Sequence, residues 1–79
     1  MAYILDVERD DRTIKGLHRT AIPCRYSVAV IEGKKTLQLT TYGSDNRIVT
    51  GQPSQTLQFT ENTALQLYRI LRAEFGFKE

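Results

Sequence analysis

The sequence predicts an α+β fold, in which a four-stranded antiparallel sheet carries one C-terminal helix packed on one face (ββββα). Four short segments alternate apolar and polar residues, as half-buried strands do. After Thr60 the apolar spacing changes to three and four residues, which is the period of an amphipathic helix. The 79 residues are expected to form a single domain, residues 1–79, because so short a chain cannot hold two cores.

The first expected strand covers residues 2–8. Tyr3, Leu5 and Val7 alternate there with Ile4 and two acids, so these three side chains are expected on the inner face. The next residues, RDDRTIKGLHRT, are charged and broken by a glycine. They predict a long loop, with or without a short strand inside it.

A hairpin is expected next. In CRYSVAVIE, residues 24–32, alternate residues are apolar, and Gly33 then supplies a residue that can adopt positive φ in a tight turn. The return strand, KTLQLTTY, directs Leu37 and Leu39 to one face. After a loop from residue 43 to 53, SQTLQFT repeats this pattern with Leu57 and Phe59.

The helix is expected from about Glu61 to Phe75. Thr60 is a suitable N-cap, and Gly76 a suitable residue to end the helix, with Phe77 folding back on it. Its apolar stripe should lie on the inner face of the sheet. The predicted core is Leu37, Leu39, Leu57, Phe59, Leu67 and Leu71.

The other face of this sheet is left polar and uncovered by the helix. A solvated face of this kind is common in antiparallel sheets, and that is one interpretation. The alternative is a binding platform, because cations, an aromatic ring, amides and hydroxyls together suit single-stranded nucleic acid. The candidate binding residues are Arg25, Lys34, Lys35, Gln38, Thr40, Tyr42, Arg47 and Gln58.

The charge distribution favours a polyanionic partner only modestly. The net charge is +2, but residues 12–50 hold seven basic side chains against two acidic ones. Residues 1–11 are acidic instead, with four acids against one arginine. A basic middle segment can contact phosphates, and solvated surface charge explains it equally well.

Catalysis is the least supported class. His18 and Cys24 are the only histidine and cysteine, and neither glycine of residues 43–51 begins a phosphate-binding loop. We therefore expect no enzyme activity, no metal site and no cofactor.

Self-association is expected, because a chain of this size with neither a disulfide nor a zinc site gains from burying more surface. The helix stripe is also wider than one sheet requires, with Ile70 and Phe77 left over, so a homodimer is predicted. An unpaired cysteine and the lack of an apolar run of about 20 residues predict a cytoplasmic protein rather than a membrane protein. The acidic start also differs from a signal peptide.

Residues 35–75 resemble the transcriptional positive cofactor family and its small bacterial relatives. The resemblance comprises a strand ending in Thr41-Tyr42, a charged loop, Gly51, a short alternating strand at residues 56–59 and a terminal amphipathic helix. It implies a coactivator-like dimer that binds single-stranded DNA across curved sheets. The chain departs from the family at Gln52-Pro53, where members tend to carry lysine. Short uncharacterised bacterial proteins with a YGS…SQxLQF-helix arrangement look similar too.

The predicted function is therefore non-catalytic binding of single-stranded DNA or RNA on the polar sheet face. The alternative is a protein-interaction or structural homodimeric module that uses the same face or a sheet edge. The two differ in their response to salt, because only phosphate contacts release condensed counterions.

Overall fold

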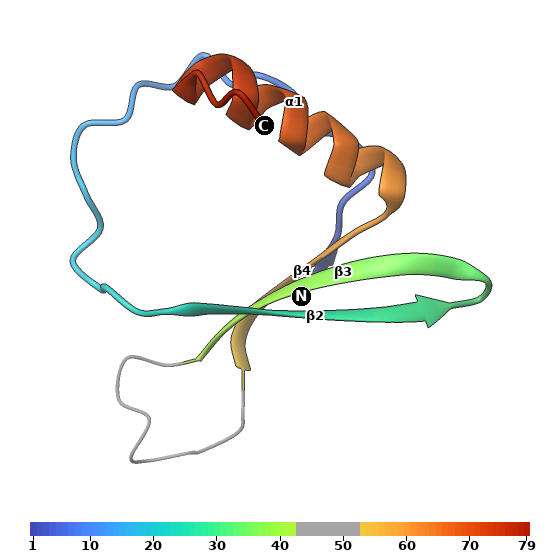
Figure 1. Cartoon of the computed structure of the whole chain (residues 1–79). Coiled ribbons are helices and arrows are strands. Elements are labelled where there is room, and N and C mark those ends of the chain that lie inside the picture. The colour runs from blue at the N-terminus through green and yellow to red at the C-terminus, as the bar shows by residue number, and fades with distance from the viewer. Residues whose placement is uncertain (43–52) are drawn as a thin grey trace.

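The structure, a computed structural model, describes residues 1–42 and 53–79. In these residues the chain forms a four-stranded sheet and one C-terminal helix (Figure 1), so the α+β ββββα fold is confirmed. The strands are β1 (Ala2–Tyr3), β2 (Cys24–Ile31), β3 (Lys34–Tyr42) and β4 (Pro53–Phe59), and the helix is α1 (Glu61–Phe75). The strand order across the sheet is β1-β4-β3-β2.

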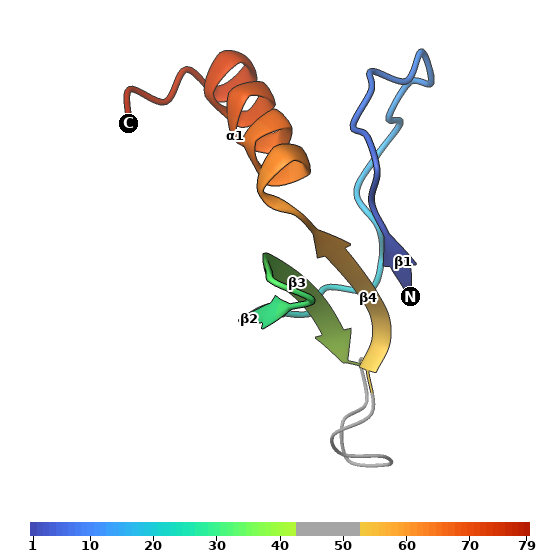
Figure 2. The same ribbon diagram turned by 90° about the vertical axis from the view of Figure 1, so that its right-hand side faces the viewer.

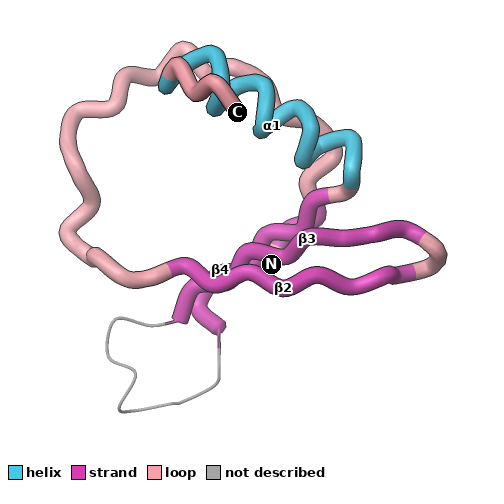
Figure 3. The backbone as a smooth tube through the Cα atoms, viewed as in Figure 1, coloured by secondary structure: helices cyan, strands magenta, loops and turns pink. Residues whose placement is uncertain are grey.

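The sheet is mixed, so the prediction of a purely antiparallel sheet was wrong. β1 pairs with β4 in parallel, with Ala2 opposite Leu57 and Tyr3 opposite Gln58. β2, β3 and β4 are antiparallel neighbours, as expected. β1 can run parallel to β4 because the two strands are not consecutive in the chain. After β1 the chain runs through residues 4–23 without regular structure and joins β2 at the opposite edge of the sheet (Figure 3).

The first strand is also shorter than the expected residues 2–8. Ile4 still donates its backbone N–H to the Gln58 carbonyl at 2.9 Å, and pairing stops there. β4 ends one residue later, at Phe59, so the chain beyond Ile4 has no strand beside it. The Val7 N–H is instead satisfied by the side-chain oxygen Oε1 of Gln66 on the helix, at 2.9 Å.

The β2–β3 hairpin has the tight turn that the sequence predicts. Glu32 and Gly33 form a two-residue loop with φ of 52° and 80°. Two successive positive φ values are the mark of a type I′ turn, whose twist matches that of the flanking strands. The hairpin pairs without interruption from Ile31 opposite Lys34 to Cys24 opposite Thr41.

The predicted helix boundaries are confirmed. Thr60 and Thr63 form a reciprocal cap: Thr63 N–H donates to Thr60 Oγ1 at 3.4 Å, and Thr60 N–H donates to Thr63 Oγ1 at 3.0 Å. Gly76 adopts φ of 71° and donates its N–H to the Arg72 carbonyl at 2.9 Å. Beyond it, the Phe77 ring stacks on Phe75 with centroids 5.5 Å apart.

The core is much smaller than predicted. Phe59, at 6% exposed, is the one buried apolar residue within the described part of the chain. Leu37, Leu39 and Leu67 are half-buried, whereas Leu57 and Leu71 are exposed, so placing these two in a core was wrong. The reason is the position of α1, which contacts β3 and β4 but not β2. Figure 2 shows that α1 lies near the sheet at its N-terminus and points away from the sheet toward its C-terminus.

Candidate nucleic-acid interface

Strand register places the polar side chains on one face of the sheet, which we call the polar face. Residues directly opposite one another in neighbouring strands direct their side chains to the same face. One row across the sheet therefore holds Tyr3, Gln58, Gln38 and Ser27, from β1 to β2. The next row holds Thr56, Thr40 and Arg25. The polar face thus extends over all four strands.

The two glutamines at the centre of the polar face are joined by hydrogen bonds. Gln58 Nε2 donates to Gln38 Oε1 at 2.9 Å, and Gln38 Nε2 donates to Thr40 Oγ1 at 3.4 Å. Both glutamines are half-buried, which restricts their rotamers. Each amide has further donor or acceptor capacity beyond these bonds, so the pair can still hydrogen-bond a ligand.

The threonines of the polar face are buried, unlike the exposed side chains expected from the sequence. Thr36, Thr40 and Thr56 are 9%, 6% and 5% exposed. Thr40 is therefore placed to hold Gln38, and it has little surface of its own to offer a ligand.

Arg25 and Tyr42 meet on the polar face near the far end of β3. The Arg25 guanidinium carbon lies 5.9 Å from the centroid of the Tyr42 ring, a cation–π distance. Tyr42 is half-buried and Arg25 is exposed. The guanidinium is thus placed for a cation–π contact with the Tyr42 ring.

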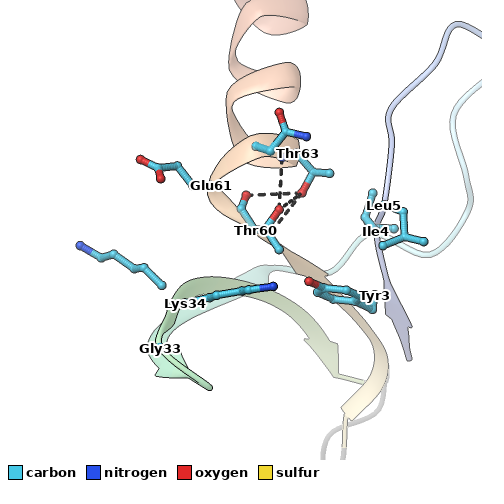
Figure 4. A pocket seen from close by; sticks show the side chains of 10 residues that line it. Tyr3, Ile4, Leu5, Gly33, Lys34, Thr60, Glu61 and Thr63 are labelled. Atoms are coloured by element: carbon cyan, nitrogen blue, oxygen red, sulfur yellow. Dashed lines mark hydrogen bonds between the residues drawn. The ribbon is translucent and has the colours of Figure 1, made fainter.

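Tyr3 ends the row of glutamines at the β1 edge of the sheet, whereas Lys34 lies at the turn end of β3, four residues from Gln38. Tyr3 is 50% exposed and lines the pocket drawn in Figure 4. Lys34 and Lys35 line the same hollow at the edge of the sheet, together with the β2–β3 turn and the start of α1. Two aromatic rings thus lie on the polar face, Tyr3 at the β1 edge and Tyr42 with Arg25 at the far end of β3, and the Lys34 cation lies at the turn end.

The structure brings together six of the eight candidate residues. Lys35 alternates with Lys34 and by register faces the other side, where it lines a groove with Val28 and Leu37, although it also lines the hollow that contains Tyr3 and Lys34. Arg47 lies outside the described residues. The six residues on the polar face are Arg25, Lys34, Gln38, Thr40, Tyr42 and Gln58.

Tyr3 is the residue that sequence reasoning missed, because the pattern of residues 2–8 placed it on the inner face with Leu5. Tyr3 pairs with Gln58 on the neighbouring strand, so the Tyr3 side chain lies on the same face of the sheet as the Gln58 side chain. No local signal in the sequence could have found this, since it depends on a pairing between the two ends of the chain.

Neither a metal site nor a catalytic cluster is found within residues 1–42 and 53–79. No group of three or more His, Cys, Asp or Glu side chains is close enough there to hold a metal ion. His18 Nδ1 accepts the Thr20 N–H at 3.0 Å within the loop, and Cys24 is exposed at the start of β2. Among the described residues, no helix combines the length and hydrophobicity that crossing a membrane requires.

Comparison of the chain with family models, with curated proteins and with solved structures finds no significant match. The resemblance to the transcriptional positive cofactor family therefore stays a prediction.

Proposed function

We propose that the polar face binds single-stranded nucleic acid without catalysis. The observation that carries the proposal is the placement on one face of two aromatic rings, one of them in contact with Arg25, around a hydrogen-bonded glutamine pair. Unpaired bases stack on aromatic rings whatever their sequence, and nearby cations neutralise the backbone phosphates. Tyr3 and Tyr42 take the bases, and Lys34 and Arg25 contact phosphate.

The size of the platform supports this assignment. Tyr3 and Tyr42 lie two strands apart across the sheet and four residues apart along it. At the usual strand spacing and rise this separates them by roughly 16 Å. That is too far for two directly stacked bases and suits an extended strand, with Gln38 and Gln58 hydrogen-bonding base edges between the rings.

Arg25 serves both kinds of contact. Its guanidinium lies at cation–π distance from the Tyr42 ring, and planar guanidinium groups also stack on bases and bind phosphate in a bidentate manner. A base at this end of the polar face can therefore stack on the Arg25 guanidinium. Alternatively, Arg25 moves to bind a phosphate and the base stacks on the Tyr42 ring. Either way the Arg25–Tyr42 pair acts as one unit.

The proposal is tested by fluorescence anisotropy with a labelled oligo-dT at two or more salt concentrations. Arg25 and Lys34 alone give an expected slope of about −1.4 for log K against log salt, at about −0.7 for each phosphate contact with a single strand. A labelled duplex is the control and should bind more weakly, because its bases are not free to stack. A parent protein that binds no oligonucleotide at low salt contradicts the proposal.

A protein-interaction module is the second candidate function. It is favoured by β2, an edge strand whose eight residues are all exposed. An unpaired strand edge can receive an extended peptide through main-chain hydrogen bonds. Binding of this kind changes little with salt, so the same titration separates the two functions.

A further inference from the structure

We propose that a second copy of this chain covers the apolar face of the sheet and the apolar stripe of α1. The apolar face is defined by Tyr26, Val28, Val30, Leu37, Leu39, Leu57 and Phe59, whose register places them opposite the polar face. The stripe is defined by Leu65, Tyr68, Ile70, Leu71 and Phe75. This interface is separate from the nucleic-acid site and stands whether or not that site binds.

The apolar face is left open on its β2 side. Tyr26, Val28 and Val30 are 73%, 50% and 69% exposed, although they alternate as core residues should. α1 makes no contact with β2. A groove lined by Val28, Leu37, Phe59 and Ala64 marks the place where helix and sheet diverge. Adjacent, aligned apolar side chains left in water on one sheet face indicate a surface that meets another protein surface.

The stripe on α1 is equally uncovered. Residues 7–9 lie along one flank of the helix, where Arg9 pairs with Glu74 at 3.4 Å. Ile70 lines a hollow beside these residues, whereas the rest of the stripe stays open, with Leu65, Tyr68 and Leu71 at least 37% exposed and Phe75 at 69%. The chain therefore carries two apolar surfaces that are only partly covered within the described residues: α1 covers the β3–β4 side of the apolar face, and the Phe77 ring stacks on Phe75 of the stripe.

The accessible surface area of the chain is larger than that of a compact monomer of the same mass. The chain has an accessible surface of 7456 Å². A compact monomer of 9.1 kDa exposes only about 4,900 Å², which leaves an excess of about 2,500 Å². The radius of gyration, 14.7 Å, also exceeds the value of about 12 Å for a compact domain of this length. Obligate homodimers bury about 2,000–5,000 Å² in total, and the part of this excess that lies on the apolar face and the stripe contributes to such an area.

A second copy fits this surface better than another partner does. In a two-fold dimer the apolar face and the stripe of each copy lie against those of the other copy. Both apolar surfaces are then buried in one closed interface. Dimerisation on this side also leaves both polar faces uncovered. A chain with one buried apolar residue among those described gains from its partner the core that it lacks.

The test measures the mass of the full chain by sedimentation equilibrium and its thermal unfolding midpoint over a hundredfold range of concentration. The expected mass is twice the 9.1 kDa of the chain, and the midpoint should rise with concentration, because mass action stabilises a dimer. A particle of 9.1 kDa with a midpoint independent of concentration would overturn the proposal.

Two substitutions, at neighbouring residues on opposite faces of β2, test which face of the sheet forms the dimer interface. Val30→Glu should abolish the dimer, giving a monomer or an unfolded chain, whereas Ala29→Glu on the polar side should leave it intact. In a lone chain Val30 is 69% exposed and lies opposite Lys35, so a carboxylate there would be tolerated. If Val30→Glu sediments as the parent dimer does, the interface lies elsewhere and the assignment fails.

Discussion

Tyr3 and Tyr42 are the residues on which the proposed function depends, because they supply the two rings of the polar face. They reach it in different ways. Tyr42 alternates with Thr40 along β3 and contacts Arg25, whereas Tyr3 comes from a two-residue strand at the sheet edge. Stacking energy belongs to the ring and not to the hydroxyl, so phenylalanine is the natural control at both positions.

Alanine at Tyr3 or at Tyr42 should each weaken oligo-dT binding by about 1–3 kcal/mol, the usual value of one base–aromatic stack. Phenylalanine at the same position should bind nearly as well as the parent, since it keeps the ring. Anisotropy titration measures both. If Tyr3→Ala binds as the parent does while Tyr42→Ala does not, the platform ends before β1.

Lys34 and Lys35 form a matched pair of neighbouring cations on opposite faces. Lys34→Ala should weaken binding and reduce the salt slope by about 0.7, because one phosphate contact is lost. Lys35→Ala removes the same charge from the apolar side and should change the slope far less. Equal effects of the two substitutions would show that general charge, and not the polar face, attracts the oligonucleotide.

Among the elements, the β2–β3 hairpin is the best defined by local chemistry, and it carries one unfavourable residue. Glu32 adopts φ of 52°, in the left-handed region that non-glycine residues avoid. Gly33 at the next position takes 80° at no steric cost. The turn therefore holds Glu32 in a strained conformation that the rest of the hairpin has to offset.

Replacing Glu32 by asparagine should stabilise the protein. Asn-Gly is the preferred pair for a type I′ turn, and asparagine relieves part of the roughly 1–2 kcal/mol that a left-handed residue costs. Urea unfolding at a single protein concentration measures the change. Glu32→Ala is the control and should give no gain, since alanine meets the same backbone penalty. An asparagine variant no more stable than the alanine variant would contradict the turn assignment.

At the scale of the whole molecule, the chain is open because its long connection and its helix both lie away from β2. Ile14 and Leu17 in the connection are 89% and 98% exposed. Residues 10–22 make only local hydrogen bonds among the described residues, such as Arg12 N–H to Asp10 Oδ1 at 2.9 Å. Such a segment opens at little free-energy cost.

Limited proteolysis should therefore begin in that connection. Trypsin is expected to cleave after Arg12, Lys15 or Arg19 before it cleaves after Arg25 in β2, since strand pairing protects the backbone there. Mass spectrometry of early time points identifies the first cut. A first cut after Arg25 or Lys34 would show that residues 10–22 are better protected than the sheet.

Where the governing signals lie within a few residues of one another, the sequence by itself determined the structure. The cap at Thr60, the left-handed Gly76 and the 3.6-residue period determined the helix bounds, and Gly33 with two alternating segments determined the hairpin. The division of β3 into Leu37 and Leu39 on one face and Gln38 and Thr40 on the other is equally local.

The tertiary structure alone decided which distant segments meet. The parallel pairing of β1 with β4 placed Tyr3 beside Gln58, although its own alternation predicted the inner face. The path of α1 away from β2 left Leu57 and Leu71 exposed, although their periodicity predicted a core. Periodicity states which face of an element is apolar, but burial depends on what lies against that face, and this is set by contacts between residues far apart in the chain.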